Sequence, residues 1–247
     1  MLEVDYKKNC TGCSACANIC PRGCIRMTAD CEGFLYPEVN EEQCMDCGLC
    51  ENVCPMLHKP KQHELVAVYG AKNRDDAVRF TSSSGGMFTL LAEEVLRQGG
   101  VVAGAALDEK LAVRHVLVDN AVDLSKLRGS KYVQSEIGTI YREVRQQLLA
   151  GKKVLFSGTP CQIAGLKGYL VKPFANLLTV DVVCHGVPSP KVYCKHLAEL
   201  GEEAGEPVVQ VRFRDKAKGW KSGETLFLTE HQRFGASKRQ ETYMRLF

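Results

Sequence analysis

Thirteen cysteines in a chain of 247 residues are the feature most able to do chemistry. Ten fall in the first 54 residues, while Cys161, Cys184 and Cys194 lie beyond. Eight of the ten form two arrays of equal spacing, Cys10-x-x-Cys13-x-x-Cys16-x-x-x-Cys20-Pro21 and Cys44-x-x-Cys47-x-x-Cys50-x-x-x-Cys54-Pro55. Each cysteine of the second array follows its counterpart by 34 residues, so the segment is an internal repeat.

This spacing is that of bacterial-type two-cluster ferredoxins. Three closely spaced thiolates wrap around one iron-sulfur cubane, and the fourth cysteine of each array serves the other cluster. We therefore predict one 4Fe-4S cluster on Cys10, Cys13, Cys16 and Cys54, and another on Cys44, Cys47, Cys50 and Cys20. Zinc is disfavoured, because its sites use separated cysteine pairs rather than a triplet followed by Cys-Pro. Cys24 and Cys31 are left over and are expected to pack as small apolar groups.

The rest of the composition narrows the class of protein. The first residues show no secretory leader, and no stretch approaches the roughly 18 apolar residues of a membrane span. We predict a cytoplasmic protein without a membrane span, where metal explains dense cysteines better than disulfides do. The net charge is +3, with −4 in residues 1–60. The basic stretch 212–221 lacks interleaved aromatic residues, so a nucleic-acid partner is not expected.

Alternating strand and helix patterns must position the remaining chemistry. Strands are predicted at 66–71, 101–107, 111–118, 153–157, 177–184, 208–213 and 224–228, and helices at 87–97, 137–149, 161–170 and 190–200. Residues 57–64 are polar and contain Pro60, which indicates a linker. The predicted fold is an α+β two-cluster ferredoxin module over residues 1–60. An α/β domain with a largely parallel sheet follows over residues 61–247.

Two loops next to these elements carry reactive residue types. Thr81–Gly86, which contains Ser83, Ser84, Gly85 and Gly86, precedes a helix and suits a phosphate; the alternative is a helix cap with surplus serines. In the loop Gly158, Thr159, Pro160 and Cys161, the threonine fits an N-cap and the proline the first helical position. Cys161 then lies where the helix field favours a thiolate, unless it is an inert buried cysteine.

A third loop, Cys184-His185-Gly186-Val187-Pro188-Ser189-Pro190, repeats the design of a cap followed by proline. It also follows a predicted strand. Ligands of open α/β sheets bind at the carboxyl ends of strands. We therefore expect the loops at Cys161 and Cys184 to share one site at that edge.

Taken in order, these motifs resemble the coenzyme F-420 hydrogenase/dehydrogenase beta subunit family, whose members often carry an N-terminal two-cluster ferredoxin. The resemblance spans nearly the whole chain. Its residues are the two cysteine arrays, Ser83–Gly86, Arg128–Ser135, Gly158–Gln162, Cys184–Pro190, Phe213–Lys216, Gly219 and Trp220.

The resemblance implies an FAD-binding oxidoreductase in which flavin trades electrons with the clusters, with Ser83–Gly86, Lys131 and Gly158–Gln162 near the flavin. The electrons would pass to or from a deazaflavin (coenzyme F-420), a ferredoxin or a small organic substrate. Redox partners would be a ferredoxin or another oxidoreductase subunit. The family's chain usually continues past residue 247 through a further cysteine-bearing segment, so a truncated product is expected.

Cys161 and Cys184 are hypothesised to ligate a further 4Fe-4S cluster completed by that segment; packing cysteines are the alternative. Two other functions remain open. One is an electron-transfer subunit without its own substrate chemistry. The other is an accessory protein that keeps the fold for docking.

Overall fold

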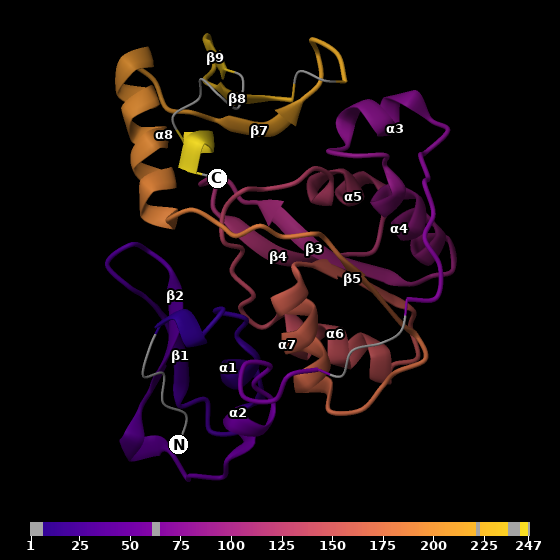
Figure 1. The fold of residues 1–247 in the computed structure, drawn as a ribbon, viewed down its shortest axis with the longest axis vertical. Helices are drawn as coiled ribbons and strands as arrows, with labels where there is room; N and C mark the ends of the chain where they lie inside the picture. Colours follow the sequence, from indigo (N-terminus) through magenta and orange to yellow (C-terminus); the bar gives the residue numbers. More distant parts are fainter. Residues whose placement is uncertain (1–6, 61–64, 221–222, 237–242, 247) are drawn as a thin grey trace.

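The computed structural model describes residues 7–60, 65–220, 223–236 and 243–246. The N-terminal module begins with a short 3-10 helix, η1 (Lys7–Asn9), and contains a two-stranded antiparallel hairpin. Its other elements are α1 (Ala15–Ile19), β1 (Ile25–Ala29), β2 (Leu35–Val39), η2 (Glu41–Gln43) and α2 (Leu49–Asn52). Figure 1 shows this indigo-to-purple module against one side of the larger domain.

A four-stranded sheet of order β4-β3-β5-β6 forms the centre of the larger domain. Its strands are β3 (Val101–Leu107), β4 (Val113–Val118), β5 (Val154–Gly158) and β6 (Leu177–Asp181). β3, β5 and β6 run parallel, and β4 pairs with β3 in the antiparallel direction. The prediction of a ferredoxin-like module followed by a largely parallel sheet is confirmed.

Helices cover both faces of this sheet (Figure 1), which is why its strands are apolar on both sides. Val102 and Leu155 pack against α4 (Met87–Arg97) and α5 (Ala121–Leu127). The alternate residues Ala103 and Phe156 pack against α6 (Ile140–Leu149) and α7 (Pro160–Leu170). The carboxyl ends of β3, β5 and β6 are therefore held at one edge by buried cores on both sides.

The last third of the chain forms a separate antiparallel sheet, β7 (Gln210–Asp215), β8 (Glu224–Leu228) and β9 (Arg233–Ala236). It packs with α8 (Pro190–Ala204) and η3 (Tyr243–Leu246) around an aromatic core that contains Tyr193, Phe213, Phe227 and Tyr243. The strands predicted at 208–213 and 224–228 exist, but they pair with each other instead of extending the parallel sheet.

One predicted strand is wrong. Residues 65–73 carry no strand, and Val66 and Val68 are 98% and 80% exposed, because no other described strand pairs with them. In the larger domain, two helices escaped prediction: α3 (Asp76–Thr81), capped by Asp75, and α5, capped by Asn120. Both caps are acceptors at helix starts, a signal present in the sequence. Within the described residues, no helix combines the length and apolarity needed to cross a membrane.

Candidate electron-transfer site

Four cysteines from both arrays come together in the N-terminal module. This first thiol group comprises Cys10, Cys13, Cys16 and Cys54. Burial, with a smaller contribution from the neighbouring Cys10 and Cys54 thiols, raises the pKa of the Cys13 thiol to about 11 and that of Cys16 to about 12. The backbone N–H of Gly12 donates to Cys10 Sγ at 3.4 Å. Such crowded thiols are suited to a positively charged iron centre.

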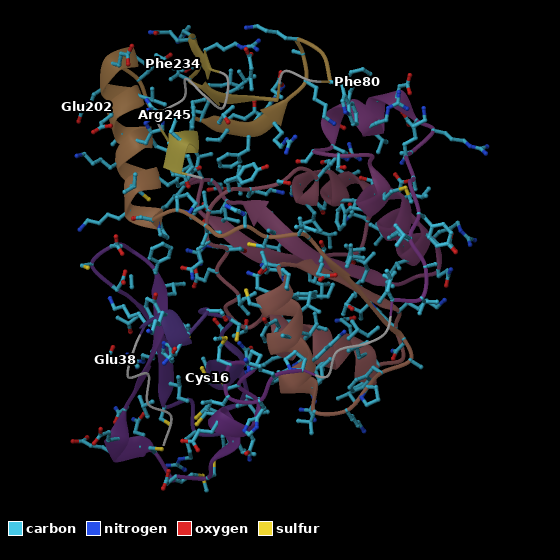
Figure 2. All side chains as sticks on the ribbon, in the orientation of Figure 1. Cys16, Glu38, Phe80, Glu202, Phe234 and Arg245 are labelled. Atoms are coloured by element: carbon cyan, nitrogen blue, oxygen red, sulfur yellow. The ribbon has the colours of Figure 1, made fainter. Side chains whose placement is uncertain are left out.

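The second thiol group, Cys20, Cys44, Cys47 and Cys50, lines a cavity in the same module together with Cys24, Ile25 and Val39. Cys20 thus leaves its own array and faces the second, as the predicted exchange of fourth ligands requires. In Figure 2 the labelled Cys16 lies in the purple module where sulfur atoms gather. All thirteen cysteines are described, and none forms a disulfide.

The two cysteine loops also repeat in their backbone. Left-handed residues stand at equivalent positions, Gly12 and Asp46 at φ 66° and 49°, and Ser14 and Gly48 at φ 62° and 70°. Only one residue of each pair is glycine, although this conformation favours glycine. The two loops therefore follow the same backbone path although their sequences differ, because each must direct its thiols to one group of four.

The leftover cysteines differ. Cys24 is buried, as expected, with its Sγ 3.3 Å from that of Cys20. Cys31 is exposed at the hairpin turn, so its predicted packing is wrong.

At the edge of the parallel sheet, β5 leads directly into α7. Thr159 is the N-cap and Pro160 the first helical residue, as predicted. The Gln162 side chain accepts from the Thr159 N–H at 2.9 Å, which is the return half of a capping box. Thr159 Oγ1 lies 3.0 Å from Cys161 Sγ, so the thiol sits in the first turn of the helix.

His115 on β4 reaches the same edge and was missed by sequence reasoning. Its Nε2 donates to the Ser157 carbonyl at 3.1 Å, and its Nδ1 accepts from Ser135 Oγ at 2.7 Å. The ring stacks on Phe156. Burial, aided by the charge of Lys131, lowers the pKa of His115 to about 4, so the imidazole is neutral. A lone histidine within a strand gives no sequence signal for this role.

Lys131 lies near His115 at the carboxyl end of α5. Its Nζ donates to the carbonyl oxygens of Lys126 and Arg128 at 3.0 and 3.1 Å. Burial lowers the pKa of its ammonium to about 7. The site therefore contains a lysine whose charge can change near neutral pH, which is a mark of functional sites.

The Ser/Gly loop, Thr81–Gly86, is attached to this region from two sides. The Ser130 N–H donates to Ser83 Oγ at 2.6 Å. Directly after β7, Lys216 Nζ donates to the carbonyls of Ser82, of Ser84 (3.3 Å) and of Arg79 (3.2 Å), and it lies 3.6 Å from the centre of the Trp220 ring. The Phe213–Trp220 motif thus shapes the Ser/Gly loop.

Gly86 is the left-handed N-cap of α4 and offers no capping side chain, so the first N–H groups of that helix have no side-chain acceptor at the cap. At Gly85 an added Cβ would lie 2.7 Å from the Ala71 carbonyl oxygen. Gly85 is thus required by internal packing, while the start of α4 retains donors suited to an anion.

The loop at Cys184 is less closely built. Val182 N–H donates to the Gly158 carbonyl at 3.0 Å, which keeps the chain after β6 beside the β5 edge, but Cys184 itself is exposed. Cys161 instead lies near the first thiol group. Burial is the main cause of the raised pKa of Cys13, and the nearby Cys161 thiol adds a smaller contribution. The two thiols share the sheet edge but face different surroundings.

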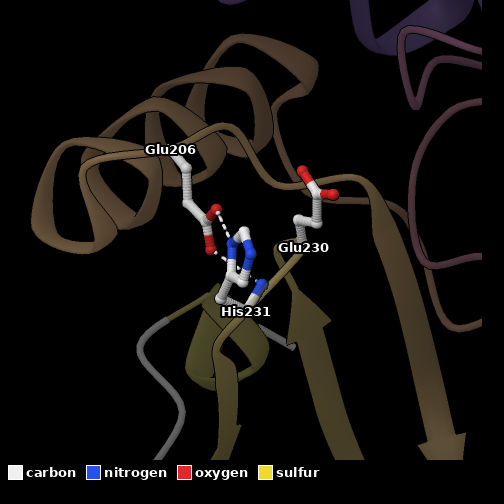
Figure 3. A group of neighbouring side chains, drawn as sticks. All are labelled: Glu206, Glu230 and His231. Carbon is white, nitrogen blue, oxygen red and sulfur yellow. Dashed lines mark hydrogen bonds and ion pairs between the residues drawn. The ribbon is translucent and has the colours of Figure 1, made fainter.

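Figure 3 shows a separate group, Glu206, Glu230 and His231, whose potential ligand atoms lie within 4.8 Å of one another. Glu206 accepts from the backbone N–H and Nδ1 of His231 at 2.9 and 2.8 Å and from Thr229 Oγ1. These hydrogen bonds lower the pKa of Glu206 to about 2, and the bond from the His231 side chain has the largest effect. They hold the turn between β8 and β9, which explains the group without a metal.

Comparison with known families gives three matches. Residues 9–57 match the 4Fe-4S dicluster domain. Residues 68–141 match the N-terminal part, and residues 151–243 the C-terminal part, of the coenzyme F420 hydrogenase/dehydrogenase beta subunit. A search of curated proteins gives no match.

Among solved structures, the chain is similar to one chain from a xenon derivative of the F420-reducing NiFe hydrogenase complex of Methanosarcina barkeri. The identity is 19% and the TM-score 0.45; the match covers 68% of this chain and 59% of that one. The family matches are consecutive and follow the order of the motifs. The chain therefore belongs to the coenzyme F420 hydrogenase/dehydrogenase beta subunit family of oxidoreductases, and it carries a 4Fe-4S dicluster domain at its N-terminal end.

Proposed function

We propose that this chain is an iron-sulfur flavoprotein oxidoreductase that passes electrons between two 4Fe-4S clusters and FAD. A single observation carries the proposal. Helix α7 begins at the sheet-edge loop Gly158–Pro160 and packs along its length against the N-terminal module, where its Gly165 adjoins Cys13. One helix therefore connects the proposed flavin site with the proposed clusters.

In this proposal each thiol group holds one cubane through four thiolates, with Cys54 and Cys20 exchanged between the arrays. The clusters supply one-electron storage. The protein contributes two features of its own. Cys13 and Cys16 are buried, and the backbone N–H of Gly12 donates to Cys10 Sγ. Hydrogen bonds to cluster sulfurs are one of the means by which proteins tune reduction potential.

The sheet edge fits FAD in charge and in available donors. The uncapped start of α4 after Ser83–Gly86 suits the pyrophosphate. Lys131 can place a positive charge beside a reduced, anionic flavin ring, and neutral His115 keeps the loop at Ser135 fixed to the end of β5. Flavin would supply the conversion between two-electron and one-electron transfer.

The wider assignment follows from this proposal. Residues 1–60 form the ferredoxin module and 61–247 the flavin-binding domain. Electrons go to or come from coenzyme F420, a ferredoxin or a small organic substrate. The redox partner is a ferredoxin or another oxidoreductase subunit, and the free thiols suit the cytoplasm. The further cluster on Cys161 and Cys184 stays a prediction for a longer form.

The experiment that tests the proposal is anaerobic purification followed by iron, sulfide and flavin analysis. Two cubanes require about eight irons per chain and as many sulfides. One FAD per chain should remain through gel filtration. Bound zinc in place of iron would refute the clusters, and eight irons without flavin would leave an electron-transfer subunit instead.

A further inference from the structure

The two thiol groups lie in different surroundings, although their sequences are repeats. Cys13, Ala15 and Val53 belong to the buried core that α6 and α7 form with the parallel sheet. Around the second thiol group, by contrast, Cys47 is exposed, and Met45 and Leu49 are 62% and 40% exposed. One group is embedded in the larger domain, and the other faces solvent.

Two glycines of α7 create the close approach on the embedded side. A Cβ added at Gly165 would lie 3.0 Å from both Cβ and Sγ of Cys13. A Cβ added at Gly168 would overlap the carbonyl oxygen of Val53, the residue before Cys54. The backbone of α7 thus lies directly against Cys13 and against Val53, the neighbour of Cys54, because neither position carries a side chain.

Polar contacts fix the same approach. Arg142 on α6 donates through Nε to the Asn18 carbonyl at 2.9 Å and through a terminal nitrogen to the Ala17 carbonyl at 3.0 Å. Asn18 Nδ2 donates to the Gly138 carbonyl at 2.9 Å. Gln134 Oε1 accepts from the Leu35 N–H at 3.0 Å. The bonds at Ala17 and Asn18 hold α1, which carries Cys16, in a fixed position relative to the sheet edge, and the bond at Leu35 does the same for β2.

From this arrangement we infer the order of the electron path, an inference that rests on the proposed function. The cluster of the first thiol group exchanges electrons with the flavin, across the seam formed by Gly165 and Gly168. The cluster of the second thiol group is the outer port, which meets an external one-electron carrier. Electron tunnelling falls steeply with distance, so the width of the seam sets the rate of the inner transfer.

The steps balance in the direction of flavin reduction. One electron leaves the outer cluster, which is oxidised, and reduces the inner cluster, which then passes it to the flavin. Two such transfers with one proton from water complete the two-electron reduction of flavin to its anionic reduced form. A reduced one-electron donor protein refills the outer cluster after each transfer.

The acidic, partly apolar surface of the outer port suggests the chemistry of that donor. Glu41 and Glu42 are exposed beside the apolar Met45 and Leu49. A donor with basic residues around an apolar, cofactor-bearing face is complementary to this surface.

The test compares alanine substitutions at glycines in two helices of the purified holoprotein. Gly165→Ala/Gly168→Ala widens the seam, whereas the matched control Gly201→Ala, in α8, has its nearest non-neighbouring atom 3.4 Å from the new Cβ. Flavin is photoreduced by a laser flash, and electron arrival is followed by the loss of cluster absorbance. The double variant should retain iron and FAD but transfer electrons several-fold more slowly, and the control should be unchanged.

Two further variants separate the clusters themselves. Cys47→Ser should remove the outer cluster and leave fast exchange between flavin and the remaining one. Cys13→Ser should abolish that exchange while the outer cluster keeps its paramagnetic signal on dithionite reduction. Fast exchange in Cys13→Ser, or an unchanged rate in the double glycine variant, would overturn the order. An unmodified chain without flavin or iron would instead refute the proposed function.

Discussion

The N-terminal module and the sheet edge bring reactive side chains together in opposite ways. In the module, three thiols of each group lie within seven consecutive residues, and the same left-handed turns recur in both loops. At the sheet edge, the decisive contacts join distant residues: Ser83 to Ser130, His115 to Ser157, and Lys216 to Ser84. The first site is a property of local sequence, and the second is a property of the folded domain.

This difference predicts how each site responds to change. Damage to a cysteine of the module should stay within one thiol group, because each cysteine serves a single group. Damage at the sheet edge should spread, because each loop there is held in place by a residue from another element.

The largest effect is expected from Cys20→Ala. Cys20 lines the cavity of the second thiol group, so its loss should remove the cluster on Cys44, Cys47 and Cys50. Iron should fall from about eight to about four per chain. Iron analysis and low-temperature paramagnetic resonance of the reduced protein measure this. Exposed Cys31→Ala is the control, and loss of all iron would contradict the independence of the two groups.

Lys216→Met should spread its effect across the sheet edge. The change leaves the carbonyls of Arg79, Ser82 and Ser84 without their shared donor, and the buried Ser82 carbonyl, left unsatisfied, costs about 1–3 kcal/mol. FAD should be lost while iron stays, as measured by flavin fluorescence after gel filtration. The matched control is Lys218→Met, whose exposed ammonium pairs only with Glu224 among its described contacts. Full retention of FAD would show that the Ser/Gly loop is not part of the flavin site.

His115 should make stability depend on pH. In the unfolded chain histidine binds a proton near its ordinary pKa of about 6.5, whereas burial keeps folded His115 neutral down to about pH 4. Stability should therefore fall as the pH drops, by about 2 kcal/mol between pH 7 and 5. Anaerobic urea unfolding followed by circular dichroism measures the change. The variant His115→Phe should lose that part of the slope, and parallel slopes would refute the assignment.

A smaller effect concerns the reactivity of Lys131. With its pKa lowered to about 7 by burial, its amine is protonated below neutral pH and mostly neutral at pH 8, where ordinary lysines remain charged. An acylating reagent at pH 8 should label Lys131 before exposed Lys167, as read by peptide mass spectrometry. Bound FAD should protect it. If labelling is equal at pH 8, or if the labelling rate of Lys131 falls about a hundredfold between pH 8 and pH 6, as that of an ordinary lysine does, instead of about tenfold, the lowered pKa is wrong.

The sequence predicted the module well because its information is local. Spacing alone indicated that Cys20 and Cys54 change partners, and the structure gathers the thiols in those sets; the cluster assignment stays a prediction. The central sheet was also predictable, since buried parallel strands are continuous apolar runs. The caps Thr159 and Pro160 were predicted from residue type, and the structure has them.

The rest required tertiary information. The apolar segment at Val66 has a strand-like composition, but a strand exists only where a partner offers hydrogen bonds. The links from Lys216 to the Ser/Gly loop and from His115 to Ser157 depend on which elements the fold places side by side. The seam at Gly165 was equally hidden, because a glycine in a helix gives no sign of the neighbour that needs the space.

The reliance of the Ser/Gly loop on Lys216 has a consequence for biosynthesis. Chains emerge from the ribosome N-terminal end first, and domains tend to fold as they emerge. All eight array cysteines are available once residue 54 has emerged, long before Lys216 and Trp220 are made. Iron can therefore enter a nascent chain, whereas the loop at Ser83–Gly86 acquires its support only after residues 216–220 have been made.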